Sequence, residues 1–355
     1  MENTLVAILK DFGIQGNILN ISLFGNGHIN KTYLVETDEN EYVLQEINSY
    51  VFKNPDILMS NISEVTNSIK NKGEKTLEVI LTNNGELYKK VNDKYYRLYF
   101  FIKNSVCYET VGDDMSLTAK LGEAFGKFHH LLADLDPKLL EETIVDFHNT
   151  PKRFENFSNA LAIASEEKKE TATPEIQYVL DHKDTYSKVV DGIKNKEINL
   201  CITHNDPKIN NILFDKATND VLCVVDLDTV MPGSVLYDIG DTFRSLFTGE
   251  NEDSTNLSLL KVRFDIFKAY MTSYLKEMKN DLTQKEIELI PYSIYLLTIE
   301  CGMRFLEDYL RGNVYFRVKY EEHNLVRART QIALAKDVLL RLDELNNIVK
   351  EILAK

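Results

Sequence analysis

Short runs of alternating hydrophobic and polar positions fill the first hundred residues. Such alternation is typical of strands that bury one face, and the Asn-Gly and Asn-Asp pairs between some of the runs favour hairpin turns. A short amphipathic helix precedes the runs, and a longer helical pattern over 57–73 separates them into two groups of three. The predicted order is β-β-β-α-β-β-β, with strands over 18–24, 29–37, 41–47, 76–81, 86–91 and 94–102.

From residue 116 onward the apolar positions recur every three or four residues, which predicts helices. The helical stretches cover 116–135, much of 151–196, 255–279, 284–311 and 321–352. One short β patch lies between them, over 199–204, 211–215 and 220–228. We therefore expect an α+β fold with two lobes: a small antiparallel β N-lobe over 1–103 and a larger, mainly helical C-lobe over 104–355.

The charge and cysteine content exclude several classes of protein. Lys and Arg number 41 against 55 Asp and Glu, which gives a net charge of −14 and argues against nucleic acid or an anionic membrane as the main partner. The N-terminus lacks a signal-peptide pattern, and no apolar run reaches about 18 residues. We expect a cytoplasmic protein, either a monomer or a weak homo-oligomer. No C-x-x-C pair predicts a zinc site or redox dithiol among the four cysteines, Cys107, Cys201, Cys223 and Cys301.

The segment CITHNDPKINNIL, followed by VVDLD, contains the residues with the clearest chemistry. Asp206 lies in a loop after a short strand, Asn211 follows five residues on, and Asp226 ends the next hairpin strand. The hairpin spacing would bring Asn211 and Asp226 to the same end of their strands. Phosphoryl transfer needs a carboxylate that accepts the proton of a hydroxyl, together with oxygen ligands that hold Mg²⁺ against nucleotide phosphates. Asp and Asn also favour turns, but the complete set at this spacing favours function.

At these residues the chain resembles the aminoglycoside phosphotransferase and choline kinase superfamily, and within it the N-acetylhexosamine 1-kinases. The resemblance covers nearly the whole chain, through FGNGHINKTYLV, YVLQEINSYVFKNP, THNDPKINNILFD, VVDLDTVMPGSVLYDIGD and GMRFLEDYLRGNVYF. It implies a protein-kinase-like fold with a nucleotide-binding N-lobe and a catalytic, substrate-binding C-lobe. It also implies that Asp206 is the catalytic base and that Asn211 and Asp226 are the magnesium ligands. The sugar contacts that it implies are His28, Asp228, Arg304 and Tyr315.

Gly25, Asn26 and Gly27 lie between two predicted strands, where a kinase has the loop that covers the phosphates. Two glycines let the backbone approach phosphates closely, although G-N-G is also an ordinary hairpin turn. The end of the last N-lobe strand, Phe101 and Ile102, falls at the joint between lobes, where backbone groups of a kinase bind adenine. Together with Gln45 on the third strand, these residues form the predicted nucleotide site.

Gln45 occupies the position where protein kinases carry a lysine on the third strand. A neutral Gln cannot offset phosphate charge. This position therefore does not show which residue supplies a cation to the nucleotide phosphates. Lys31 and Lys53 are candidates, and each is equally well explained as a surface lysine.

Three other residues allow more than one interpretation. Asp228 is two residues beyond Asp226, so the two would share a face if both ended a strand; it could bind metal or sugar hydroxyls. Asp238 is predicted to tie the catalytic loop or to cap the next helix. Arg304 has Glu300 and Asp308 one turn away as candidate salt-bridge partners, whereas Arg304 and Tyr315 together would suit a sugar.

The preferred hypothesis is a Mg²⁺-dependent small-molecule kinase that uses ATP to phosphorylate a sugar, at the anomeric hydroxyl of N-acetylglucosamine or N-acetylgalactosamine. A second hypothesis changes the acceptor to an aminoglycoside, choline or another amino alcohol, which Arg304 would disfavour. A third, motivated only by Gln45, is a non-catalytic, pseudokinase-like binding protein.

Overall fold

The computed structural model describes residues 2–25, 29–249 and 251–355. The chain divides into two compact units. The first comprises Met1–Cys107, Asp134–Val145 and Asn211–Pro232, and the second comprises Tyr108–Ala133, Asp146–Asn210 and Gly233–Lys355. The expected division at residues 103 and 104 stays a prediction.

The first unit consists mainly of β-strands, together with the helices α1 and α2. Its elements are α1 (Glu2–Leu9), β1 (Ile18–Leu23), β2 (Lys31–Thr37), β3 (Glu41–Ile47), α2 (Pro55–Asn71), β4 (Val79–Ile80), β5 (Lys89–Val91), β6 (Lys94–Phe100), β7 (Ser105–Val106), β9 (Ile212–Asp215) and β10 (Val221–Val224). The predicted order of three strands, a helix and three strands is confirmed. The strands β4 and β5 are shorter than predicted. The expected turn between them is present and is closed by hydrogen bonds between Thr82 and Glu86.

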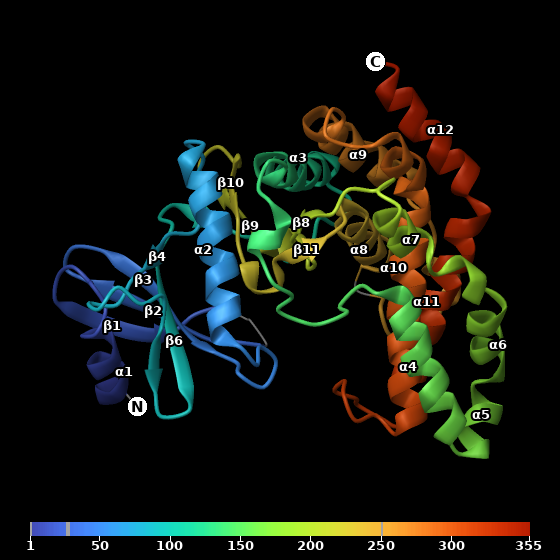
Figure 1. Cartoon of the computed structure of the whole chain (residues 1–355), viewed down its shortest axis with the longest axis horizontal. Coiled ribbons are helices and arrows are strands. Elements are labelled where there is room, and N and C mark those ends of the chain that lie inside the picture. The colour runs from blue at the N-terminus through green and yellow to red at the C-terminus, as the bar shows by residue number, and fades with distance from the viewer. Residues whose placement is uncertain (1, 26–28, 250) are drawn as a thin grey trace. The chain divides into compact units, whose positions relative to one another are not determined.

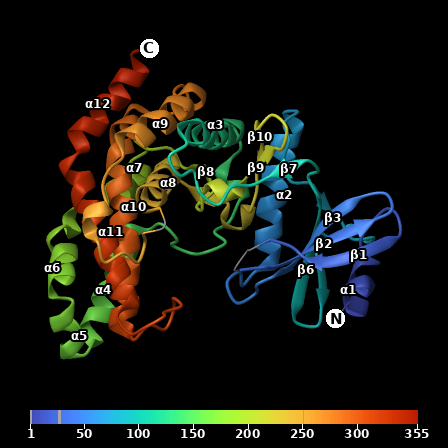
Figure 2. The ribbon, with the colours of Figure 1, turned by 180° about the vertical axis from the view of Figure 1, so that it is seen from behind.

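Figures 1 and 2 show the main sheet of this unit, with β1, β2, β3 and β6 as neighbours. Its strand order is β1-β2-β3-β6-β4, and β5 pairs with β6 beside it. The pairs β1–β2, β2–β3 and β3–β6 are all antiparallel. In this register Gln45 lies opposite Thr32 on one side and Arg97 on the other.

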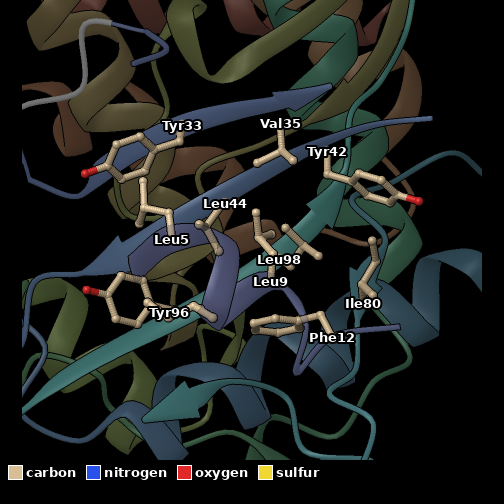
Figure 3. Close-up of a cluster of buried hydrophobic side chains, with 11 residues drawn as sticks. Leu5, Leu9, Phe12, Tyr33, Val35, Tyr42, Leu44, Ile80, Tyr96 and Leu98 are labelled. Carbon is tan, nitrogen blue, oxygen red and sulfur yellow. The ribbon is translucent and has the colours of Figure 1, made fainter. Parts of the chain in front are cut away.

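One face of the sheet is hydrophobic and packs against α1 (Figure 3). Leu5 and Leu9 of α1 contribute to a buried cluster with Tyr33, Leu44 and Leu98, which are cross-strand neighbours on β2, β3 and β6. Alternate residues of a strand point to opposite faces. The row formed by Thr32, Gln45 and Arg97 therefore belongs to the opposite face, where Met59 of α2 contacts the Arg97 guanidinium.

A second sheet in this unit has the order β10-β9-β7. The β9–β10 hairpin is antiparallel, and its turn is closed by the hydrogen bond from the Asp215 amide to the Asp220 carbonyl. The hairpin was predicted from the sequence. The two-residue strand β7 was not, because it is too short to show an alternating pattern.

The second unit is mainly helical, as predicted. Its elements are α3 (Met115–Leu132), α4 (Thr150–Ile163), α5 (Glu166–Thr171), α6 (Thr173–Asp181), α7 (Lys188–Lys194), β8 (Cys201–Thr203), α8 (Val235–Thr248), α9 (Phe264–Met278), α10 (Gln284–Arg311), α11 (His323–Leu340) and α12 (Leu342–Leu353). The strand β11 (Met231–Gly233) falls where the chain passes into this unit. Together with the antiparallel sheet of the first unit, these helices confirm the α+β class.

The longest helix, α10, packs against α4, α8 and α11 (Figures 1 and 2). It begins with a capping box between Thr283 and Glu286 and ends at Gly312, which has a left-handed backbone. Within the described residues it is the one helix whose length and composition would allow it to cross a membrane, but 83% of its apolar window is buried inside the protein. Its hydrophobicity is therefore explained by its place in the core.

Helix α8 was not predicted. Its polar residues Asp238, Asp241 and Arg244 are buried together with its apolar ones. Its apolar residues Leu236, Ile239, Phe243 and Phe247 recur at helical spacing, so the sequence does contain the signal for this helix. Ser234 caps its N-terminus, so of the two roles predicted for Asp238 the helix cap is filled by another residue.

Candidate active site

The predicted site residues fall into two groups, one in each unit. Asp206, Arg304 and Tyr315 belong to the second unit, and Gly25, Gln45, Phe101, Ile102, Asn211, Asp226 and Asp228 belong to the first. Asn26, Gly27 and His28, which were predicted to bind the nucleotide or the sugar, lie outside the described residues.

Asp206 lies in the loop that follows β8, and Asp238 of α8 holds the backbone of that loop. One carboxylate oxygen of Asp238 accepts the amide of His204 and the other accepts the amide of Asn205, each over 2.7 Å. Asn205 has a left-handed backbone, with φ of 62°. The prediction that Asp238 ties this loop is confirmed, and the two hydrogen bonds fix the turn that presents Asp206.

His129 of α3 holds Asp238 from the other side. Its Nε2 lies 2.7 Å from Asp238 Oδ2, and its Nδ1 lies 2.9 Å from the hydroxyl of Tyr274. Burial by itself would raise the pKa of Asp238, but His129 and the His204 amide outweigh it and leave the pKa below its ordinary value. The carboxylate therefore stays ionised and accepts all three hydrogen bonds. The sequence indicated only that His129 lay on a helix.

The ammonium group of Lys208 forms an ion pair with Asp206, the predicted base. Its Nζ lies 2.6 Å from Asp206 Oδ1, and both side chains are partly exposed. Burial lowers the pKa of Lys208, but the charge of Asp206 more than offsets this and raises it overall. Lys208 was not among the predicted site residues, although its place two positions after Asp206 is a signal that could have found it.

A cavity of about 340 Å³ opens beside Asp206 within the second unit. Its lining combines aromatic rings with charged groups of both signs. The residues are Phe147, His148, Asn205, Asp206, Lys208, Asp241, Arg244, Glu252, Leu297, Glu300, Cys301, Arg304, Phe305, Phe316, Arg317 and Arg327. Asp206, the predicted base, and Arg304, a predicted sugar contact, therefore line the same cavity.

Arg304 projects between two aromatic rings of this lining. Its guanidinium carbon lies 5.6 Å from the ring centre of Phe147 and 5.7 Å from that of Phe316. Its expected salt-bridge partners are engaged elsewhere: Glu300 accepts hydrogen bonds from His148 and Thr150, and Asp308 accepts backbone amides. Such a guanidinium retains donors for a ligand.

Asp308 organises the loop after α10 that carries Tyr315. Its carboxylate accepts the amides of Val314, Tyr315 and Phe316 over 2.8–2.9 Å. The Tyr315 side chain is 71% exposed and lies edge-on to Phe316, with ring centres 4.8 Å apart. Phe316 lines the cavity and Tyr315 does not, so the loop contributes a different aromatic residue to the lining from the one that the sequence indicated.

In the first unit, Asn211 and Asp226 flank the same end of the β9–β10 hairpin. Ile212 pairs with Val224, and the amide of Val225 donates to the carbonyl of Asn211 over 2.8 Å. This confirms the prediction that the hairpin brings the two residues to one end. Asp226 is exposed, and its φ of 57° places it in the left-handed region.

Asp228 is buried, whereas Asp226 is exposed. Residues Leu227–Thr229 form a 3₁₀ turn rather than a strand end, so the condition under which the two carboxylates would share a face is not met. Asp228 is only 3% exposed. Its Oδ1 lies 2.5 Å from Nη1 of Arg97, and its Oδ2 accepts a hydrogen bond of 2.6 Å from Asn30.

The predicted nucleotide-binding residues lie around the main sheet. Gly25 has a φ of +74°, which favours glycine, and open space around its Cα. Gln45 bridges two side chains, since its Oε1 accepts from Arg97 Nε over 2.9 Å and its Nε2 donates to Thr32 over 3.1 Å. The Phe101 amide donates to Glu41, and the Ile102 carbonyl accepts from Ser105.

The donor set at the hairpin end is compatible with Mg²⁺. Among the described residues no group of three His, Cys, Asp or Glu side chains is arranged to hold a metal ion. Mg²⁺ usually takes one or two protein oxygens and completes its octahedron with water and phosphates. The amide of Asn211 and the exposed carboxylate of Asp226 supply two such oxygens.

An antiparallel sheet followed by a mainly helical part, with an Asp-bearing loop after a short strand, is a kinase-like fold. The chain belongs to the phosphotransferase enzyme family (APH), whose model matches residues 20–266. Solved structures agree with this fold at low sequence identity.

Three such structures cover almost the whole chain. An aminoglycoside phosphotransferase from Alicyclobacillus acidocaldarius has 10% identity and a TM-score of 0.65 over 98% of this chain and 96% of its own. A microcompartment-associated aminopropanol kinase has 14% identity and a TM-score of 0.63 over 98% and 99% of the two chains. A choline kinase from Cryptosporidium parvum has 12% identity and a TM-score of 0.62 over 98% and 99%. These likenesses confirm the kinase-like fold.

Proposed function

We propose that the protein is a Mg²⁺-dependent kinase that transfers the γ-phosphoryl group of ATP to the anomeric hydroxyl of N-acetylglucosamine or N-acetylgalactosamine. The observation that carries the proposal is that Asp206 and Arg304 line the same cavity. A carboxylate that can accept a hydroxyl proton there shares a lining with a guanidinium flanked by two aromatic rings. Aromatic faces and fork-like donors suit the apolar faces and the carbonyl and hydroxyl oxygens of an acetamido sugar.

In the proposed reaction Asp206 accepts the proton of the acceptor hydroxyl. The hydroxyl oxygen attacks the γ-phosphorus, and the bond from that phosphorus to the β-γ bridging oxygen breaks. Lys208, 2.6 Å from Asp206, pairs with the carboxylate and orients it. Asn211 and Asp226 are the residues that would hold Mg²⁺, which offsets the charge of the phosphates when it is bound. Asp238 and His129 keep the loop of Asp206 in place.

The charges of the cavity argue against a cationic acceptor. Asp241 and Glu252 are both paired with Arg244, at 2.6 and 3.6 Å, and Glu300 accepts hydrogen bonds from His148 and Thr150. Arg304, Arg317 and Arg327 add positive charge to the same lining. The related structures include kinases named for aminopropanol and choline, whose acceptors carry a cationic nitrogen. Such an acceptor would be repelled by these guanidinium groups, whereas a neutral sugar would not.

A coupled assay of ADP release with Mg²⁺ and ATP tests the proposal against its alternatives. N-acetylglucosamine, N-acetylgalactosamine, choline, aminopropanol and an aminoglycoside are supplied in turn, and Asp206→Asn serves as the inactive control. We expect acceptor-dependent ADP release with the two sugars and a product that has lost its reducing end. Turnover with the amines and not the sugars would favour an amino-alcohol kinase. No acceptor-dependent release with any of them would favour a non-catalytic binding protein.

A further inference from the structure

Arg97 is a buried cation that was not among the predicted site residues. It lies on β6 in a run of aromatic residues, is 1% exposed, and sits directly opposite Gln45 on β3. Gln45 occupies the position where a protein kinase has a lysine. The main sheet therefore does contain a cation next to this position, but on the neighbouring strand and in the interior.

The contacts of Arg97 join three separate segments of the first unit. Its Nε donates to Gln45 over 2.9 Å, and its Nη1 lies 2.5 Å from Asp228 in the turn after β10. The other oxygen of Asp228 accepts from Asn30, whose own Oδ1 accepts the amide of Asn48 over 3.0 Å. Arg97 thus connects the sheet to the turn that begins at Asp226 and to the start of β2.

The burial of this pair means that each charge depends on the other. Burial lowers the pKa of Arg97, but the charge of Asp228 more than offsets this and raises it, so the guanidinium is held in its charged form. A buried ion pair stabilises little compared with an apolar pair of similar volume, but a lone buried charge left by removal of one partner is strongly unfavourable. Stability by itself is therefore a poor explanation for placing an Arg–Asp pair here.

We propose that Arg97 is a positioning residue for the cation site: by fixing Asp228 in the turn Leu227–Thr229, it holds the backbone of Asp226 so that this exposed carboxylate is presented to a divalent cation. Because Arg97 is almost fully buried, it acts through Asp228 and does not itself contact phosphates. Asp228 is then occupied by Arg97 and Asn30, and it sets the geometry of the turn. Groups that orient metal ligands commonly affect metal affinity by about 10- to 100-fold. The inference rests on the proposed function only for the assignment of Asp226 as a cation ligand.

Binding of Mn²⁺ to the protein–ADP complex tests the proposal without relying on turnover. Free Mn²⁺ is measured by electron paramagnetic resonance for the wild type, for Arg97→Met and for the double variant Arg97→Met/Asp228→Leu. The double variant removes both buried charges, so it keeps the fold even if the single variant does not. We expect a Mn²⁺ affinity at least 10-fold weaker in every variant that folds, with a thermal midpoint near that of the wild type for the double variant.

Arg329→Met is the matched control, because Arg329 forms a partly buried ion pair with Glu175 at 3.1 Å in the second unit. We expect its Mn²⁺ affinity to remain within 2-fold of the wild type. A folded double variant that binds Mn²⁺ within 2-fold of the wild type would overturn the proposal, and so would an equal loss in Arg329→Met. These results do not depend on the acceptor. If the protein phosphorylates no sugar but the double variant loses Mn²⁺ affinity, the proposed function is contradicted and the positioning role of Arg97 is supported.

Discussion

His129 Nε2 lies 2.7 Å from the carboxylate of Asp238, and that carboxylate accepts the amides of His204 and Asn205. The helices α3 and α8 therefore fix the backbone just before Asp206 through a single side chain. The loop that carries the proposed base is held from within the core of the second unit. Its position depends on a carboxylate that must remain ionised.

Acid should weaken this arrangement in a predictable pH range. The pKa of Asp238 is lowered on folding, so its contribution to stability is complete above its unfolded value near 3.8 and is lost as the pH falls through the folded value. Asp238→Asn should lower the free energy of unfolding at pH 7 by about 3 kcal/mol, and its stability should fall less steeply below pH 4. Urea denaturation between pH 7 and pH 3 measures both effects. Equal pH dependence in Asp238→Asn and in the exposed control Asp93→Asn would contradict this prediction.

Replacing the proposed base should remove turnover and spare nucleotide binding. Asp206→Asn keeps the size of the side chain but cannot accept the hydroxyl proton, so we expect kcat to fall by about 10³-fold or more. Isothermal titration with ADP and Mg²⁺ should give a Kd within about 2-fold of the wild type. If Asp206→Asn retains more than a small fraction of kcat, Asp206 is not the base.

Lys208 offers a separate test of how Asp206 is held. Lys208→Met removes the cation 2.6 Å from the carboxylate, while the carboxylate itself remains. We expect kcat to fall by about 10- to 100-fold, clearly less than in Asp206→Asn, with the KM for ATP little changed. A rate unchanged from the wild type would show that the ion pair has no part in the reaction.

Arg304 should determine which acceptor is used. Arg304→Met preserves much of the packing against Phe147 and Phe316 but removes the donors and the charge. We expect the KM for N-acetylglucosamine to rise by about 10-fold or more, with the KM for ATP unchanged. Arg311→Met, on the same helix but exposed and paired with Glu307, is the control. Equal sugar KM values for the two variants would exclude Arg304 from the acceptor site.

A close helix crossing in the second unit gives a prediction for stability. A Cβ atom on Gly122 of α3 would lie 2.2 Å from the carbonyl oxygen of Tyr270 on α9, so Gly122→Ala forces the two backbones apart. We expect a loss of about 1–3 kcal/mol in the free energy of unfolding, measured with urea. Glu123→Ala, at the next and exposed position, should change it by less than about 0.5 kcal/mol.

The sequence predicted the parts of the fold that have a clear period or turn chemistry. The strands of the main sheet, the β9–β10 hairpin and the helix α10 follow directly from apolar spacing and from Gly and Asn turns. The helix α8 was missed although its apolar residues Leu236, Ile239, Phe243 and Phe247 have helical spacing. Asp241 and Arg244 pair with each other one turn apart, whereas the partners of Asp238, namely His129 and the amides of His204 and Asn205, come from other segments, which periodicity does not reveal.

The same limit applies to the candidate site. The spacing of Asp206, Asn211 and Asp226 predicted a loop and a hairpin end, and the structure has both. It did not predict that Asp228 turns inward, because that depends on Arg97, more than 120 positions earlier in the chain. An arginine at an inward-facing position of an aromatic strand was the available signal, since a buried cation requires a buried partner.

The left-handed backbone of Asp226 restricts which side chains this position accepts. Asn tolerates a φ of 57° about as well as Asp does, whereas a longer side chain such as Glu adopts it at a cost. Asp226→Asn therefore changes the charge and keeps the backbone, and Asp226→Glu keeps the charge and strains the backbone. A single turn of the chain thus separates two properties of a metal ligand that are usually altered together, its charge and its placement.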